Sequence, residues 1–179
     1  MKKLLLVLST LAFVNAAFAA EADNDKPYVE IGYTGLTYKE SLGSWSPSNL
    51  RFIVGKNEGN FGYEGMLSFN TATDSVAISS VTNTYKVNYM YGIYYKALSH
   101  LSSDLEVFGR LGWSGFNETM SYSNGTASAD QTASGLSYGA GVKYKVSKDM
   151  NLNLDYMVYY PTKNNISLTG YTIGLGFNF

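Results

Sequence analysis

The amino-acid sequence predicts an all-β fold, an eight-stranded antiparallel up-and-down transmembrane β-barrel. Three observations predict it: a strict alternation of large apolar residues at the end of the chain, the same two-residue period in seven earlier segments, and connections that are alternately short and long. Neighbouring side chains of a strand point to opposite faces, so this period separates an apolar face from a small or polar one. We expect the apolar face to contact lipid and the other face to line a narrow lumen.

The last nine residues carry the clearest alternation. Their small or polar face holds Thr172, Gly174, Gly176 and Asn178. A water-soluble sheet would need a second layer to cover the opposite face, which holds only large apolar residues. These residues are Tyr171, Ile173, Leu175, Phe177 and Phe179.

The start of the chain has the pattern of a secretory signal peptide. Lys2 and Lys3 precede an apolar stretch over residues 4–13, and Ala17 and Ala19 form a small-x-small cleavage site. The stretch is shorter than the roughly 20 apolar residues that a membrane-spanning helix needs. We therefore expect cleavage after Ala19, with residues 1–19 as the signal and residues 20–179 as one barrel domain.

Composition narrows the possible partners and chemistry. Loss of the two signal lysines from the 13 basic residues leaves 11 against 14 acidic ones, a net charge of −3, which argues against a nucleic-acid partner. The chain has no cysteine, so disulfides, thiolate metal sites and cysteine nucleophiles are excluded. We expect no cofactor and no bound metal.

The connections between the alternating segments indicate the orientation. Short turns follow the second, fourth and sixth segments, and longer polar loops follow the first, third and fifth, of which Asn117 to Ala133 is the longest. Short periplasmic turns and long extracellular loops are typical of bacterial outer-membrane barrels, and an even strand number places both termini in the periplasm. The expected strands are residues 28–38, 50–56, 61–70, 85–97, 105–116, 136–146, 151–160 and the C-terminal segment.

The alternation also predicts which rings anchor the barrel in the membrane. In the fourth segment, for example, Tyr85, Tyr89 and Tyr95 fall on the apolar face, and Lys86 and Lys96 on the polar face. Aromatic residues at the two membrane interfaces form girdles in such barrels. The expected girdle is Tyr63, Phe69, Tyr85, Tyr95, Trp113, Tyr138 and Tyr144.

The chain resembles the small outer-membrane β-barrel domain family, the porin-family eight-stranded barrels of the OmpA and OmpX type. The C-terminal alternation carries most of the resemblance, with support from residues 110–112 and 138–144. The resemblance implies an outer-membrane location, contact with lipid and lipopolysaccharide, and recognition of the C-terminal strand by the barrel assembly machinery. We expect a monomer, without the peptidoglycan-binding domain of full-length OmpA proteins.

Charged residues share the small-residue face and are expected inside the barrel. Because an unpaired charge in a nearly dry lumen is costly, they should form pairs. The turns suggest Lys96 with Glu106, Lys143 with Asp155, and Arg51 with Glu64, while Arg110, facing Gly92, would reach Glu64 or Asp155. The expected network is Glu30, Arg51, Glu64, Lys86, Lys96, Glu106, Arg110, Lys143 and Asp155, with Lys145 on the same face. It would plug the lumen, and the alternative is a narrow ion-conducting pore.

One sequence feature raises the possibility of catalysis. His100 and Ser102 match the letters of the His-x-Ser pair that barrel lipid A deacylases carry near the outer leaflet. Here the pair falls in an expected periplasmic turn, so we expect a non-enzymatic protein. A structural role in the envelope, recognition of an unknown surface ligand through the loops, and a narrow pore remain open.

Overall fold

The computed structural model describes residues 26–41, 43–78, 81–123, 129–163 and 166–179. The expected signal peptide, residues 1–19, lies outside these ranges. In the described part of the chain, no helix is long and apolar enough to cross a membrane. Its ordered elements are strands joined by turns.

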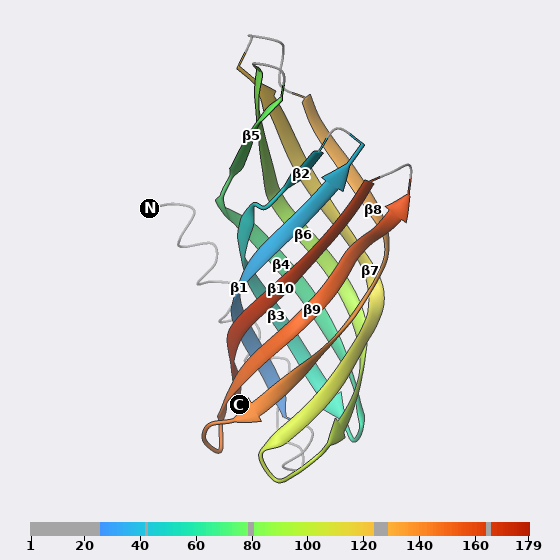
Figure 1. The fold of residues 1–179 in the computed structure, drawn as a ribbon. Coiled ribbons are helices and arrows are strands. Elements are labelled where there is room, and N and C mark those ends of the chain that lie inside the picture. The colour runs from blue at the N-terminus through green and yellow to red at the C-terminus, as the bar shows by residue number, and fades with distance from the viewer. Residues whose placement is uncertain (1–25, 42, 79–80, 124–128, 164–165) are drawn as a thin grey trace, which may run out of the picture.

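Ten antiparallel strands form one sheet in the described residues. Eight of them make the wall of a barrel, and the short strands β2 and β5 extend it at one end (Figure 1). The strands are β1 (Pro27–Glu40), β2 (Gly43–Trp45), β3 (Ser48–Glu58), β4 (Phe61–Ala72), β5 (Asp74–Ile78), β6 (Val81–His100), β7 (Leu105–Tyr122), β8 (Ala129–Lys145), β9 (Met150–Lys163) and β10 (Ile166–Asn178).

The barrel closes where its last strand pairs with its first. The β1–β10 register runs without a shift from Tyr28 opposite Asn178 to Lys39 opposite Ser167. Closure leaves no free edge along the wall, which is what a sheet requires in lipid because unpaired backbone groups there are costly. The expected eight-stranded antiparallel barrel is therefore confirmed, with two additional short strands.

The two ends of the barrel differ as expected. At the periplasmic end, tight turns join β3 to β4, β6 to β7 and β8 to β9, and the C-terminus lies at this end (Figure 1). The first of these turns contains Gly59, whose φ of 62° is a left-handed conformation that glycine adopts without steric cost. The opposite, extracellular end carries β2, β5 and the ends of the longest strands.

Large apolar side chains face outward along the strands. Tyr63 is 59 % exposed, Leu67 55 % and Leu175 42 %, whereas the alternate residues Glu64 and Met66 are buried. The inward row is the small or charged one, so the orientation predicted from the alternation is confirmed.

Glycines allow the wall to curve tightly around its contents. A Cβ added to Gly112 would lie 2.0 Å from the carbonyl oxygen of Ile93, and one added to Gly139 would lie 2.3 Å from that of Tyr156. Since these neighbours are backbone atoms of adjacent strands, no rotamer change could relieve the overlap. The room inside is left to the few long side chains that cross the lumen.

The sequence underestimated the length of the extracellular hairpins. Most of Asn117 to Ala133, expected to be a loop, lies in β7 and β8, and the polar segment after β4 contains β5. β6 has 20 residues and β7 has 18, against the roughly 9 to 11 that a tilted membrane-crossing strand needs. These hairpins extend beyond the membrane, where the outward side chains are polar, as at Lys86 and Thr119, so no apolar alternation marks the strand.

A β-bulge in β6 changes which residues face inward. Val87 pairs with Glu118 and Tyr89 with Asn117, so Asn88 is an extra residue on β6. Its side-chain amide donates to Asn117 Oδ1 and Thr119 Oγ1, both at 2.7 Å. Before the bulge, odd-numbered residues of β6 face the interior, and after it, even-numbered residues do.

The bulge makes two sequence predictions wrong. Tyr85 was expected in the outer aromatic girdle, but it is fully buried inside the barrel. Lys86 was expected in the lumen, but it is half-buried on the opposite face of β6. Both errors arise because the sequence alternation was extended through Asn88 without a change of phase.

Candidate functional site

The interior of the barrel is the candidate site, and Arg110 on β7 is its most connected residue. Its Nη2 donates to Glu30 Oε2 at 2.9 Å, and its Nη1 donates to Asp155 Oδ2 at 2.9 Å. Glu64 accepts from both Nε and Nη2, the second bond measuring 3.0 Å. One buried guanidinium therefore joins carboxylates from β1, β4 and β9.

A second arginine shares one of these carboxylates. Arg51 on β3 makes a two-bond contact with Asp155, in which Nη1 donates to Oδ1 at 2.9 Å and Nη2 donates to Oδ2. The same Nη1 lies 3.0 Å from the hydroxyl of Tyr159. Asp155 therefore bridges the two guanidinium groups, and its negative charge offsets their mutual repulsion.

Two lysines complete the network towards the periplasmic end. Lys96 Nζ lies 3.1 Å from Glu106 Oε1, and Lys143 Nζ lies 3.7 Å from Glu30 Oε1 and 3.8 Å from Glu106 Oε1. Both ammonium groups also approach the ring of Tyr28, at 5.1 and 4.6 Å from its centroid. The Tyr28 hydroxyl donates to Glu64 Oε1 at 2.6 Å, which ties the lysine and arginine parts together.

The interior network is electrically balanced. It contains four cations and four carboxylates, each in an ion pair and each from the inner face of a strand of the wall. Such a set avoids the cost of an unpaired charge in a low-dielectric lumen. Its members are Glu30, Arg51, Glu64, Lys96, Glu106, Arg110, Lys143 and Asp155.

The pairing expected from the turns is only partly observed. Lys96 does meet Glu106, and Arg110 reaches both Glu64 and Asp155. Arg51, however, pairs with Asp155 across the lumen and not with Glu64 on the adjacent strand. Lys143 pairs with Glu30 and Glu106 in place of Asp155. The lumen is narrow enough for contacts between opposite walls to replace those between neighbours on one wall.

One further expectation about this face is wrong. Arg110 does not face Gly92, because its cross-strand neighbours are Lys96 on β6 and Gly139 on β8. Lys145 is on the same face of β8 as Lys143, as expected, but it is exposed at the periplasmic mouth and outside the network.

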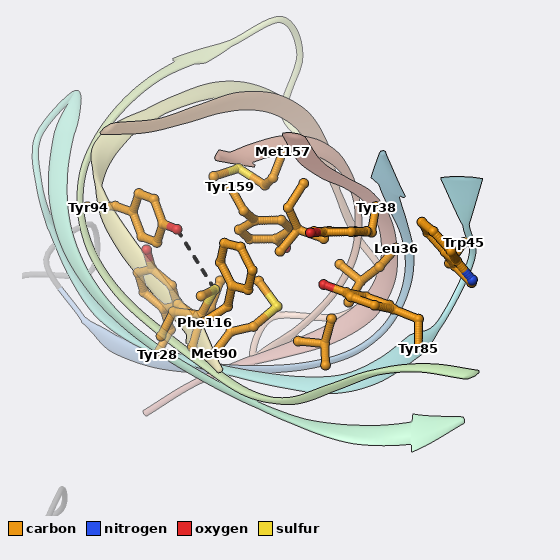
Figure 2. Packing of buried hydrophobic residues seen from close by; sticks show 14 residues of the cluster. Tyr28, Leu36, Tyr38, Trp45, Tyr85, Met90, Tyr94, Phe116, Met157 and Tyr159 are labelled. Atoms are coloured by element: carbon orange, nitrogen blue, oxygen red, sulfur yellow. Dashed lines mark hydrogen bonds between the residues drawn. The ribbon is translucent and has the colours of Figure 1, made fainter. Parts of the chain in front are cut away.

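An aromatic layer packs inside the barrel on the extracellular side of the charges. The rings of Tyr38 and Tyr85 are stacked with centroids 4.1 Å apart, and Trp45 lies against both (Figure 2). The two tyrosine hydroxyls donate to the carboxylate of Glu118, at 3.3 Å from Tyr38. The remainder of the layer is apolar or aromatic: Leu36, Val87, Met90, Phe116, Met157, Tyr159 and Leu168.

Sequence reasoning missed this layer and its acid. Glu118 continues the inward row of Ser114 and Phe116 on β7, so a longer strand would have placed it inside. The outward neighbours of this region, such as Lys86 and Thr119, are polar, so it lies beyond the apolar band of the barrel. Burial raises the pKa of Glu118, while the hydrogen bonds from Tyr85 and Tyr38 lower it.

The other expected membrane contacts lie on the outer surface. Six of the seven girdle rings are exposed: Tyr63, Phe69, Tyr95, Trp113, Tyr138 and Tyr144. The alternating residues of the C-terminal strand are exposed as well: Tyr171, Ile173, Leu175, Phe177 and Phe179.

His100 and Ser102 lie near the periplasmic turn between β6 and β7. The His100 ring is largely exposed, and its Nε2 is 3.9 Å from Glu106 Oε2. The Ser102 hydroxyl accepts the backbone N–H groups of Asp104 and Leu105, at 3.3 and 3.1 Å. The serine thus stabilises the turn.

The fold and its outward apolar surface agree with comparisons to known proteins. The family model described as the outer membrane protein beta-barrel domain matches residues 4–179. The chain belongs to this family. This outer-membrane β-barrel protein is accordingly located in the outer membrane, as the sequence predicted. No curated protein sequence matches it.

Solved structures of small outer-membrane barrels share the fold. Neisserial surface protein A has a TM-score of 0.67 at 18% identity, with coverage of 86% of this chain and 97% of that one. Ail, the attachment invasion locus protein of Yersinia pestis, was solved with the heparin analogue sucrose octasulfate; it has a TM-score of 0.64 at 16% identity, with coverage of 87% and 99%. OprG from Pseudomonas aeruginosa has a TM-score of 0.61 at 12% identity, with coverage of 89% and 99%.

Proposed function

We propose that this outer-membrane barrel is non-enzymatic and non-conducting, and that it acts in envelope structure or in surface interactions through its extracellular hairpins. The observation that carries the proposal is the filling of the lumen by two successive layers, the balanced charge network and the aromatic layer above it. An ion crossing the barrel would have to displace paired, buried side chains in the first layer and apolar rings in the second.

The periplasmic entrance is consistent with a closed lumen. A polar depression of about 570 Å³ opens there, and Glu106 and Lys143 of the charge network are among its lining residues. Because its lining includes these two residues of the network, water that enters the barrel from the periplasm meets the ion pairs there and does not cross the lumen.

Conductance in planar bilayers tests the closed lumen. We expect the purified protein to give no stepwise current under conditions where a porin of known conductance does. Stepwise current whose ion selectivity changes in Glu30→Gln would overturn the proposal and favour the narrow pore, because Glu30 faces the lumen and not the lipid.

Lipid A modification is tested at His100. We expect His100→Ala to leave the acylation of lipid A unchanged when membranes of expressing cells are compared by mass spectrometry. The supporting observation is that His100 and Ser102 lie at the periplasmic end, where the serine hydroxyl is engaged by the turn. A change in acyl-chain number on substitution would make the protein an enzyme.

The charge of the extracellular end bears on the kind of surface partner. Apart from the buried Glu118, the hairpins there contain the lysines Lys39, Lys86 and Lys163 and the acids Glu40, Asp74 and Asp130. Ail binds a sulfated heparin analogue, but an extracellular end without excess positive charge favours a different class of ligand here. We expect no retention on immobilised heparin at physiological ionic strength, and salt-sensitive retention would reverse this inference.

The remaining expectations about biogenesis form part of the proposal. Residues 1–19 would be removed on export, the C-terminal strand would be recognised by the barrel assembly machinery, and the mature protein would be a monomer in contact with lipopolysaccharide. Native mass spectrometry of protein extracted from outer membranes in a mild detergent tests cleavage after Ala19 and the monomeric state together.

A further inference from the structure

A groove lies on the membrane-facing wall where β3, β4, β6 and β7 run side by side. Two adjoining depressions of about 760 and 550 Å³ share the residues Val54, Gly65, Ile93 and Trp113. Val54 is opposite Gly65, which is in turn opposite Ile93, so these residues form one row across three strands. The groove is open to lipid and separate from the lumen.

Gly65 forms the floor of this groove, and neither its packing nor its backbone conformation requires a glycine. It interrupts an outward row of large side chains between Tyr63 and Leu67 on β4. A Cβ at Gly65 would meet no atom within 4 Å, and its φ does not require glycine. Glycine weakens a strand interior and often marks a place where a ligand approaches the backbone closely.

One end of the groove is charged, and the rest is apolar. The outward row of β3 continues from Phe52 and Val54 to Lys56 and Glu58, which line the end nearest the periplasmic turn. A cation and an anion two residues apart complement a headgroup that itself carries a phosphate and an ammonium. The apolar part, walled by Ile93 and Trp113, suits an acyl chain.

We propose that the groove is a binding site for one zwitterionic phospholipid of the ethanolamine class from the periplasmic leaflet. Its phosphate contacts Lys56, its ammonium contacts Glu58, and one acyl chain lies over Gly65 between Val54 and Ile93. The location in the outer membrane and the groove carry this inference, which is independent of whether the lumen conducts.

The length of the groove fits a single leaflet. Four residues separate Lys56 from Phe52, which at about 3.3 Å per residue is about 13 Å along the strand. Because strands of such barrels tilt by about 35–45°, this is about 10 Å along the membrane normal, which lies within the roughly 15 Å that half of a 30 Å hydrocarbon core spans. A chain anchored at Lys56 therefore reaches towards the bilayer centre within the groove.

Native mass spectrometry of protein released from outer membranes in a mild detergent tests the proposal. We expect the mass of one protein with one retained phosphatidylethanolamine. Gly65→Leu fills the groove and should lower the retained lipid about tenfold, equivalent to about 1.4 kcal/mol of binding free energy. Gly35→Leu is the matched control, because Gly35 is also an outward glycine with no atom near its Cβ and lines neither depression.

The headgroup contacts have their own test. Lys56→Ala leaves the groove open and should still reduce the amount of retained phospholipid. In a separate test, the purified protein is exchanged into defined lipids. It should bind less phosphatidylglycerol, which has no ammonium, than phosphatidylethanolamine. Heat-modifiable migration on gels verifies that each variant is folded.

Three results would overturn the proposal. Equal retention in Gly65→Leu and Gly35→Leu would place the lipid elsewhere. A dimer mass without lipid, lost in Gly65→Leu, would make the groove an interface between two copies. Retained lipopolysaccharide in place of phospholipid would assign the groove to the opposite leaflet.

Discussion

Arg110 shows how one residue can organise the interior of a small barrel. It contacts acids from three strands, and its guanidinium carbon lies 4.4 Å from the centroid of the Phe108 ring. A planar guanidinium with five donors suits this position better than an ammonium, since it can bond in several directions within one plane. The sequence identified Arg110 and its partners Glu64 and Asp155, because all three are charged residues on a face that otherwise holds mostly small side chains.

Replacement of Arg110 should be the most damaging single change in the lumen. Arg110→Met leaves Glu30 and Glu64 buried with too little positive charge, so we expect the free energy of unfolding to fall by about 3–5 kcal/mol. Urea titration of the folded barrel in lipid vesicles measures this. Lys86→Met is the control, and because Lys86 is outside the network it should change the value by about 0.5 kcal/mol or less.

Glu118 should make the stability of the extracellular end depend on pH. Its pKa is raised above the ordinary 4.5 because burial disfavours the carboxylate, so the folded state binds a proton more tightly than the unfolded chain does. Its contribution to stability is therefore full below pH 4.5 and is lost as pH rises through the raised pKa. Glu118→Gln should remove this decline.

Unfolding free energies of the wild type and Glu118→Gln, measured at intervals between pH 4 and 8, provide the comparison. We expect the wild type to lose stability relative to the variant as the pH rises. If the unfolding free energies of the two proteins change with pH in parallel, the Glu118 carboxyl has the same pKa in the folded and the unfolded state, which would contradict the prediction.

At the level of elements, β6 shows where sequence patterns reach their limit. Its tyrosines at 85, 89, 91 and 95 alternate without interruption, so the pattern itself contains no sign of a bulge. The change of phase depends on how β6 pairs with β7 at Asn88, and pairing is a property of two strands. For the same reason, the sequence could not place Tyr85 in the aromatic layer.

Single cysteines on either side of the β6 bulge test its phase, since the chain contains no cysteine of its own. We expect Lys86→Cys to react with a membrane-impermeant maleimide added to intact cells, because residue 86 is on the outer face of an extracellular strand. Val87→Cys should react at least about tenfold more slowly, since Val87 is fully buried. Faster reaction of Val87→Cys than of Lys86→Cys would mean that β6 has no bulge at Asn88 and that its alternation continues without a change of phase.

For the whole molecule, the sequence predicted the architecture well and the contacts across the lumen poorly. Strand number, orientation and the outward apolar face follow from periodicity and loop lengths, which each segment carries by itself. The partners of Arg51 and Lys143 depend on which side chains the closed wall brings opposite one another. That arrangement is set by strand tilt and stagger around the whole circumference.

The terminal residue should affect assembly more than stability. Resemblance to the family implies that the alternating C-terminal strand is the assembly signal, and Phe179 is exposed at its end. We expect Phe179→Ala to lower the folded fraction in outer membranes several-fold, measured by heat-modifiable migration. Phe61→Ala, at another exposed phenylalanine beside a periplasmic turn, should leave the folded fraction near the wild-type level.

The ion pairs of Arg110 and Lys143 with Glu30 join strands that are distant in the unclosed sheet. Glu30 belongs to β1, which reaches β7 and β8 only when β1 meets β10. Before β1 pairs with β10, Glu30 is separated from Arg110 and Lys143, and these charges lie unpaired near hydrocarbon at a cost of several kcal/mol. A β1–β10 pairing that is one residue out of register separates them in the same way. The same charges that fill the finished barrel therefore penalise incomplete and misaligned intermediates, and so favour a single way of completing the cylinder.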